Sequence, residues 1–361
     1  MPKKTVLFEQ HLKLGAKMID FGGWSMPVSY TTVIDEHVAT RTKAGLFDIC
    51  HMGEVIVEGP DAARFLQRLV TNDVERLTDG RAQYACICRE DGTTVDDLFV
   101  YRFSKNRYML VTNAANAEKD LIWAKGQSGG FDVEVNDIGE KTGKIDLQGP
   151  NSEQILSQLT DTDLSCLKRF FFTEGKINGV RMTISRTGYT AEDGFELYPD
   201  AAKSESVWIA LLRAGSAFGL KPVGLGARDT LRIEACYSLY GHELSESITP
   251  IEAGLGLIVK PQTGFIGSAA LSRQMDPARK IVAFEMTDSG VPRADYRIIC
   301  GEDIGYVTSG TFSPTFRKGL GQGLISAHNA IIGKEIGILI RERKYRARIV
   351  ERPFYAYGGR K

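Results

Sequence analysis

The chain has 361 residues, with 45 lysines and arginines balanced by 45 aspartates and glutamates. This balance leaves no global positive field, which argues against nonspecific binding to nucleic acid or to an anionic membrane surface. No apolar run approaches the ~20 residues that span a bilayer, and the N-terminus lacks a signal-peptide core. We therefore expect a cytoplasmic, bacterial protein with neither nucleic acid nor membrane as partner, long enough for two or three domain cores.

Two segments resemble each other at an offset of 90 residues, 58–69 and 148–159. In each, an apolar strand meets a Gly-Pro pair, and leucines then follow at helical spacing. The repeat predicts two related strand–helix units, in agreement with a pseudo-symmetric pair.

The segments between and after these units predict an α+β fold with mainly antiparallel pairing. The expected elements are a hairpin (98–103 with 107–112), a helix (117–125), a strand (131–135), a strand (181–185), a hairpin-like segment (187–198) and a helix (204–213). After a linker at 276–280, short strands are expected at 281–286, 305–309, 321–325, 335–340 and 344–350. These last strands predict a small barrel or sandwich of about eighty residues.

Cysteine, histidine and glycine patterns exclude several cofactors. The six cysteines and five histidines are dispersed, so we expect buried free thiols and no metal site, with Cys86 and Cys88 on one face of a strand. Gly224–Asp229 lacks the third glycine of a dinucleotide fingerprint, and Gly139–Lys144 has the wrong spacing for a phosphate loop. The sequence therefore predicts no nucleotide cofactor.

The segment Gly224–Gly241 predicts a helix that opens at Gly224 and ends at Gly241. Arg228 lies in the first turn, where the positive end of the helix dipole disfavours a cation. Asp229 can neutralise Arg232 three residues later, but Arg228 has no such local partner. Arg228 is therefore a candidate anion site; the alternative, favoured by the segment alone, is pairing with a distant acid.

Three further acidic residues, in two segments, are candidates for chemistry. Asp96 and Asp97 are neighbours in an apolar strand, so their carboxylates should point to opposite faces, one of them toward a site where it can handle protons. On local evidence a solvated turn pair is the favoured alternative. Glu196 lies between Phe195 and Leu197 and can contact solvent or the donor groups of a flat ligand. Four tyrosines are candidates to line such a site, although core packing is the commoner role of aromatic residues: Tyr84, Tyr101, Tyr189 and Tyr237.

Seven motifs together resemble one family, the aminomethyltransferase or T-protein of the glycine cleavage system. They run in order along the chain: Phe21–Pro27, Phe47–Glu54, Asp96–Leu98, Asn113–Asp120, Arg186–Leu197, Gly224–Gly241 and Thr308–Pro314. One local departure is Ala191, which stands where relatives often have glycine.

The resemblance implies a three-domain cloverleaf around a central folate cavity. Residues 1–275 would form two interleaved α+β domains that bind folate, and residues 281–361 a C-terminal β-barrel or jelly-roll domain. By similarity, Asp97 is the catalytic carboxylate, and the folate contacts are Met52, Tyr84, Tyr101, Thr112, Asn113, Tyr189, Glu196, Arg228 and Tyr237.

The family reaction transfers a one-carbon unit. An aminomethyl group on the lipoyl arm of the H-protein would pass its methylene to tetrahydrofolate, releasing ammonia and leaving 5,10-methylenetetrahydrofolate and dihydrolipoyl H-protein. The implied partners are the lipoylated H-protein and, in the same system, the P- and L-proteins. No metal, flavin or nucleotide is implied.

Because one fold serves several functions, alternatives stay open. A folate-dependent demethylase is one, and a folate-binding accessory protein of iron–sulfur assembly is another, although its Lys-Gly-Cys motif is absent here. A sarcosine or dimethylglycine oxidase would need a flavin domain for which the chain has no length.

Overall fold

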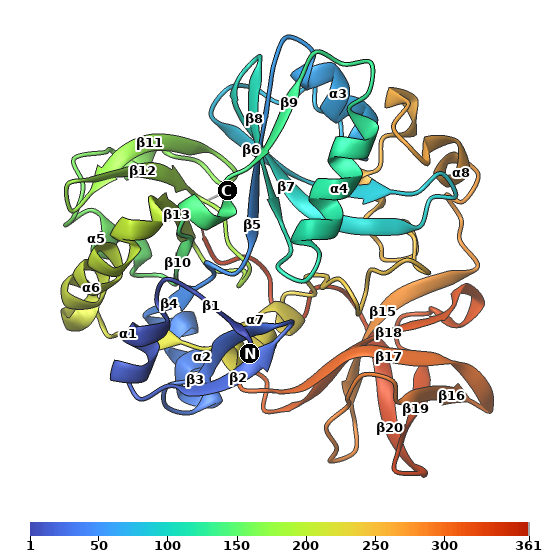
Figure 1. Cartoon of the computed structure of the whole chain (residues 1–361). Coiled ribbons are helices and arrows are strands. Elements are labelled where there is room, and N and C mark those ends of the chain that lie inside the picture. The colour runs from blue at the N-terminus through green and yellow to red at the C-terminus, as the bar shows by residue number, and fades with distance from the viewer. Residues whose placement is uncertain (360–361) are drawn as a thin grey trace.

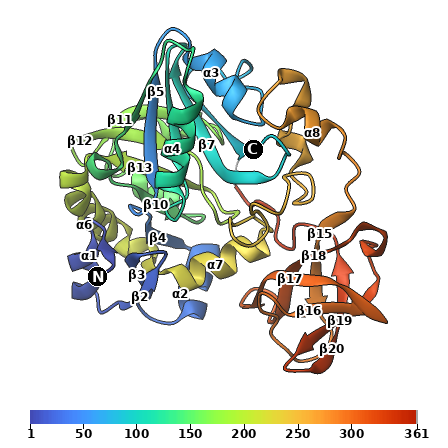
Figure 2. The same ribbon diagram turned by 45° about the vertical axis from the view of Figure 1, so that its right-hand side comes forward.

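The computed structural model describes residues 1–359, and the chain forms three lobes that meet near the centre of the molecule (Figure 1). One lobe is built on a six-stranded sheet, one on a five-stranded sheet and one on a closed barrel. The turned view in Figure 2 separates the barrel from the other two lobes. This confirms the predicted class: mixed α+β lobes followed by a C-terminal barrel.

The six-stranded sheet is antiparallel except where its edge strand β14 runs parallel to β4. In spatial order its strands are β11 (Phe172–Ile177), β12 (Val180–Ser185), β13 (Gly194–Pro199), β10 (Ile145–Gln148), β4 (Ala44–Asp48) and β14 (Leu220–Val223). The helices of this lobe are α1 (Phe8–Lys13), α2 (Val33–Thr42), α5 (Ser152–Leu156), α6 (Ser204–Gly215) and α7 (Leu225–Glu234). Beside them lies a small sheet of β1 (Lys3–Lys4), β3 (Trp24–Ser29) and β2 (Lys17–Phe21). The core of the lobe is aliphatic around the fully buried Trp208 and Phe195.

The five-stranded sheet is antiparallel throughout. Its order is β6 (Arg81–Cys88), β7 (Thr94–Ser104), β8 (Arg107–Thr112), β5 (Gly53–Glu58) and β9 (Glu134–Asp137), and its helices are α3 (Ala62–Leu69) and α4 (Ala117–Gln127). The chain passes from β4 of the first sheet into β5 of this one and returns through β10, so the two lobes are interleaved, as predicted.

The predicted pair of strand–helix units is confirmed as β5–α3 and β10–α5, one in each sheet. Both turns need glycine, since Gly59 has φ +142° and Gly149 has φ +126°, and a Cβ at either would meet backbone atoms.

The C-terminal lobe is a closed six-stranded barrel. Its order is β15 (Arg279–Met286), β18 (Lys318–Ser326), β17 (Glu302–Ser313), β16 (Arg297–Cys300), β19 (Glu335–Ile340) and β20 (Arg343–Val350). The five strands expected in this part are confirmed, whereas β16 was missed because it has only four residues and a bulge in its pairing with β17.

The remaining segments connect the lobes. Between α7 and the barrel lie turns, two 3-10 helices (Gly256–Ile258 and Pro261–Thr263) and α8 (Ser268–Ser272). Other 3-10 turns are Gly139–Lys141, Leu164–Cys166, Ala201–Lys203, Ser216–Phe218 and Ala327–Asn329. After β20 the tail returns to the other lobes, where the Tyr355 amide donates to Glu234 O and the Gly358 amide to Ala191 O. In the described part of the chain, no helix is long and apolar enough to cross a membrane.

Three sequence predictions need correction. The segment 187–198 is not a hairpin: only Gly194–Pro199 is a strand, and a loop precedes it that Arg186 anchors through Asp193 (2.9 Å). The strand expected at 131–135 begins three residues later, because Phe131 packs on Phe65 instead of pairing. Among the cysteines, Cys166 is exposed.

Candidate active site

Asp97 lies near the start of β7 and is held by two neighbouring elements. Its Oδ2 accepts from the Tyr84 hydroxyl of β6 (2.9 Å), and its Oδ1 accepts from Asn113 Nδ2 at the end of β8 (3.0 Å). Burial and the charge of Asp96 raise the pKa of Asp97 to about 7, against the two hydrogen bonds, which lower it. A carboxylate with a pKa near neutrality can both accept and release protons under working conditions.

The neighbouring Asp96 is fully buried and points away, under α4. Its Oδ1 accepts from Asn113 Nδ2 and Asn116 Nδ2, both at 2.9 Å. The predicted opposite orientation of the two aspartates is therefore observed, and the solvated-turn alternative is wrong. Asn113 is the side chain that bonds to both.

Helix α7 begins at Leu225, with Gly224 as its N-cap. A Cβ at Gly224 would lie 2.4 Å from the carbonyl carbon of Val28, so the close approach of β3 requires glycine. The Gly224 amide donates to Glu36 Oε2 (2.9 Å), so a carboxylate of the chain itself already lies at the positive end of the dipole. The helix ends at Glu234, not at Gly241 as predicted, because Cys236 adopts a left-handed φ of 55°.

Arg228 has the distant partner that the sequence analysis offered as the alternative. Its Nη1 lies 3.2 Å from Asp146 Oδ2, and its guanidinium lies 4.9 Å from the centroid of the Tyr189 ring. Asp146 is fully buried in β10, and its Oδ1 has no donor among the described residues. Burial and the charge of Glu196 raise the pKa of Asp146 to about 7, although Arg228 and Lys144 oppose the rise. The predicted pair of Arg232 with Asp229 is confirmed at 2.8 Å.

Glu196 lies on β13 at the centre of a hydroxyl network. Its Oε2 accepts from Thr187 (2.7 Å), Tyr198 (3.1 Å) and Tyr101 (3.2 Å). Its Oε1 lies 3.5 Å from Lys144 Nζ. The pKa of Glu196 is lowered, because Lys144 and the hydroxyl donors outweigh the effect of burial. Glu196 is therefore a permanent anion with one oxygen left for further donors.

Two more buried groups face this cluster. Burial raises the pKa of Glu54 on β5 to about 8, and its Oε1 lacks a donor within the described chain. Burial lowers the pKa of His51 to about 4, and its Nδ1 likewise lacks a partner there. Between them, Lys144 Nζ reaches Met52 Sδ at 3.5 Å. Unsatisfied polar atoms grouped in an interior are typical of a site completed by a ligand.

Tyr189 is influenced by both Asp97 on the five-stranded sheet and Arg228 on α7. Its hydroxyl donates to Ser238 O (2.5 Å), and its ring lies 5.7 Å from that of Tyr237. The charges of both Asp97 and Arg228 act on the Tyr189 hydroxyl, although burial is the largest cause of its raised pKa. Tyr237 in turn accepts from Arg169 Nη2 (3.2 Å), whose guanidinium lies 3.9 Å from the ring centroid of Tyr357 in the tail.

Nine of the ten residues named from the sequence fall into three contact groups. The groups are Tyr84, Asp97 and Asn113; Met52, Tyr101 and Glu196, joined through Lys144; and Tyr189, Arg228 and Tyr237. The groups make up one arrangement, because the charge of Glu196 acts on Asp146, the partner of Arg228, and the charge of Asp97 acts on Tyr189. Tyr101 belongs to it but is fully buried, which suits support of Glu196 more than contact with a ligand. The exception is Thr112, whose hydroxyl donates to Gly53 O (3.5 Å) across the β5–β8 pair.

Comparison with known proteins assigns the family. Residues 7–263 match the model of the GCVT N-terminal domain, and residues 279–356 match that of the glycine cleavage T-protein C-terminal barrel domain. The chain belongs to the glycine cleavage T-protein family.

Individual relatives match this chain over nearly their whole length. An aminomethyltransferase of Geobacillus kaustophilus is 51% identical over 98% of this chain and 99% of its own. One of Caldanaerobacter subterraneus is 49% identical over 98% of this chain and 96% of its own. The crystal structure of the glycine cleavage system aminomethyltransferase T from Bartonella henselae superposes with a TM-score of 0.94 at 32% identity, covering all of both chains. This T-protein family member is therefore an aminomethyltransferase of the glycine cleavage system.

Sequence reasoning missed five residues that belong to this candidate site. They are His51, Glu54, Asp120, Lys144 and Asp146. A signal was present for Asp146, a lone acid between Ile145 and Leu147, and for Asp120, one helical turn after Asn116. Lys144 gave no signal, because its partner Glu196 is 52 positions away.

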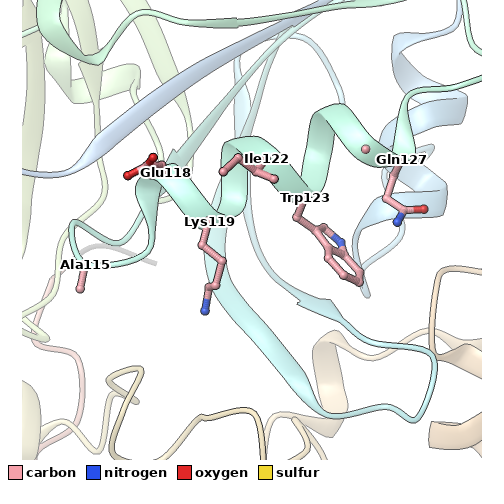
Figure 3. Close-up of a pocket in the computed structure, with 7 residues that line it drawn as sticks. Ala115, Glu118, Lys119, Ile122, Trp123 and Gln127 are labelled. Carbon is pink, nitrogen blue, oxygen red and sulfur yellow. The ribbon is translucent and has the colours of Figure 1, made fainter.

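Of two hollows on the surface, one lies apart from this site and the other borders it at Tyr237. An open one of about 550 Å³ lies along the outer side of α4, lined by Lys119, Ile122 and Trp123 among others (Figure 3). A second, of about 10 Å³, has room for roughly one water molecule between Tyr237, Glu192 and Tyr357. Among the described residues, no group of three or more His, Cys, Asp or Glu is arranged to hold a metal.

Proposed function

We propose that this enzyme takes the methylene carbon of an aminomethyl group, carried as a thioether on the lipoyl arm of an H-protein, and transfers it to tetrahydrofolate. The products are ammonia, 5,10-methylenetetrahydrofolate and dihydrolipoyl H-protein. The observation that carries the proposal is Asp97, a carboxyl group with a pKa near neutrality held at a site rich in unpaired acceptors. The transferase family membership supports it.

The residues present fit a folate. The pyrimidine edge of a pterin offers N–H donors. Asp146 Oδ1 and Glu54 Oε1 are buried oxygens that lack hydrogen-bond donors in the described chain, and Glu196 Oε1 has the ion pair with Lys144 at 3.5 Å. Satisfying such atoms recovers the free energy lost by desolvating them. Bound folate supplies the two nitrogens, N5 and N10, that accept the methylene.

The chain's own residues act by binding and by moving protons. Tyr84 and Asn113 fix the carboxyl of Asp97, which orients the pterin near N10 and accepts a proton released in the transfer. Arg228 grips an anionic part of the folate, most simply its glutamate tail, because a guanidinium matches a carboxylate in geometry and charge. Met52, Tyr101, Thr112, Tyr189 and Tyr237 complete the proposed lining or its support.

We further propose that residues 1–275 form the folate-binding region and residues 281–361 a separate domain. The partners are the lipoylated H-protein, with the P- and L-proteins in the same system. The cytoplasm of a bacterium is the proposed location.

The test is incubation of the enzyme with aminomethylated H-protein and tetrahydrofolate, followed by measurement of ammonia. We expect ammonia release that depends on folate and on the enzyme. Ammonia at the enzyme-free rate, together with turnover of a methylated small molecule, would establish the demethylase alternative.

A further inference from the structure

A second buried acid lies beside Asp96. Helix α4 presents Lys119 and Trp123 to one side and Glu118 and Ile122 to another (Figure 3). Asp120, only 2% exposed, lies on its inner face and is in hydrogen-bond contact with Asp96. It follows Asn116 by four residues, which places both side chains over the same strand.

The oxygens in this contact can be bonded only if they share a proton. Asp96 Oδ1 is occupied by two amide donors, whereas Asp96 Oδ2 and both Asp120 oxygens have no donor in the described chain. The nearby cation, Lys119, directs its Nζ to Val95 O (2.7 Å) and to the Tyr240 hydroxyl (3.0 Å). Two ionised carboxylates cannot face each other in an interior, so one of them must be protonated.

The electrostatics agree on which one. Burial, the hydrogen bond to Asp96 and the charge of Asp96 raise the pKa of Asp120 to about 11, against a lowering by Lys119. Asp120 is therefore neutral at physiological pH and donates, while Asp96 accepts hydrogen bonds from Asp120, Asn113 and Asn116.

We propose that Asp120 is a positioning residue: its protonated carboxyl fixes Asp96, and Asp96 through Asn113 sets the orientation and the charge state of Asp97. The proposal rests on the proposed function for its kinetic consequence, but not for the shared proton itself. The path is continuous, since Asn113 Nδ2 donates to Asp96 Oδ1 at 2.9 Å and to Asp97 Oδ1 at 3.0 Å.

Among the described residues, the side chains that face Asp97 from other elements carry no charge at pH 7 that would shift its pKa. They are Tyr84 and Cys86 from β6, and Tyr189 from the loop before β13. Burial raises the pKa of all three, so they are neutral at pH 7. Lys119 and Asp120 from α4 lie behind Asp96, so the charge of Asp96 is the nearest one that Asp97 experiences.

The experiment compares Asp120→Leu with Asp120→Asn in the full-length enzyme. Asparagine supplies a neutral N–H donor to Asp96 Oδ2, and leucine supplies none. We expect Asp120→Leu to lower kcat by roughly tenfold or more, because a displaced catalytic group loses its productive geometry. The acid limb of its pH–rate profile should also shift, because the charge of Asp96, which raises the pKa of Asp97, is no longer held in place.

Asp120→Asn should recover most of the lost turnover and the original acid limb. A wild-type pH profile in Asp120→Leu, or equal damage in both variants, would overturn the proposal.

Infrared difference spectroscopy tests the shared proton without turnover and serves also if Asp120→Leu fails to fold. The spectrum of the wild type minus that of Asp120→Asn at pH 8 should show the carbonyl stretch of a buried protonated carboxyl, because the signal of Glu54, whose pKa is about 8, is common to both proteins and cancels. Glu118→Gln, on the outer side of the same helix, is the matched control and should keep the band. Absence of the band from this difference spectrum would overturn the proposal even if the enzyme releases ammonia as proposed.

Discussion

The two sheets bury acids next to each other but compensate them differently. On the six-stranded sheet, Asp146 and Glu196 have cations beside them, Arg228 and Lys144. On the five-stranded sheet, Asp96, Asp97 and Asp120 are held by amides, a tyrosine and one another. Lys144 keeps Glu196 charged, and Arg228 and Lys144 oppose the rise in the pKa of Asp146, which still reaches about 7. Asp97 and Asp120 have no such ion-pair partner in the described chain, and their pKa values rise to about 7 and about 11. The first cluster therefore suits recognition through its charged groups, and the second suits proton transfer.

The strongest test of this contrast is Asp97→Asn. The amide keeps the size of the side chain but cannot take up a proton, so kcat for ammonia release should fall by about a thousandfold. Folate affinity, measured by calorimetry, should stay within a few fold. Tyr84→Phe serves as the control, since it removes one hydrogen bond to Asp97 and leaves the carboxyl in place. Near-normal turnover in Asp97→Asn would contradict the assigned role.

Arg228→Ala tests the cation-compensated cluster. It leaves Asp146 buried without its ion-pair partner, which should cost about 3 kcal/mol of unfolding free energy in addition to weaker folate binding. The double variant with Asp146→Asn should recover most of the stability and none of the affinity. Denaturant unfolding and calorimetry separate the two effects, and unchanged affinity in Arg228→Ala would remove the arginine from the folate site.

The protonation of Asp146 predicts a pH dependence of stability. Its pKa is about 7 in the folded chain and near 3.8 when unfolded, so the native state holds the extra proton between these values. The stability that this proton contributes to the folded state is fully present below pH 4 and is lost as the pH rises through 7. Asp146→Asn should therefore gain stability relative to wild type between pH 5 and pH 8, on the order of 2–3 kcal/mol. A constant difference over that range would show that Asp146 does not titrate between pH 5 and pH 8.

The smallest expected effect concerns the loop before β13. Ala191 has a left-handed φ of 63° and is 3% exposed. Ala191→Gly should stabilise the fold by about 1 kcal/mol, because glycine adopts this conformation without steric cost. Thermal unfolding measures it, with Ala202→Gly in a regular 3-10 turn as the control that should not be stabilised.

Sequence periodicity predicted the elements that bury one apolar face, such as the β5–α3 and β10–α5 units. It misplaced the end of α7, where the left-handed conformation of Cys236, and not a glycine, breaks the helix. The resemblance named residues that do meet in space, but not Lys144, Asp146 or Asp120. The apolar neighbours of Asp146 and the spacing of Asp120 from Asn116 are local patterns, but the partners lie on other strands and helices, and pairing across a fold leaves no pattern that identifies the partner. For the same reason the sequence could not identify the partner of Arg228, because Asp146 is 82 positions away.

The most direct test of the central claim is a carbon-13 NMR titration of the aspartate side chains, with Asp97 and Asp120 assigned from the spectra of Asp97→Asn and Asp120→Asn. The Asp97 carboxyl should titrate near pH 7, while that of Asp120 should stay protonated beyond pH 9. If both carboxyls are ionised at pH 5, the five-stranded sheet carries no shared proton and the contrast between the two clusters fails.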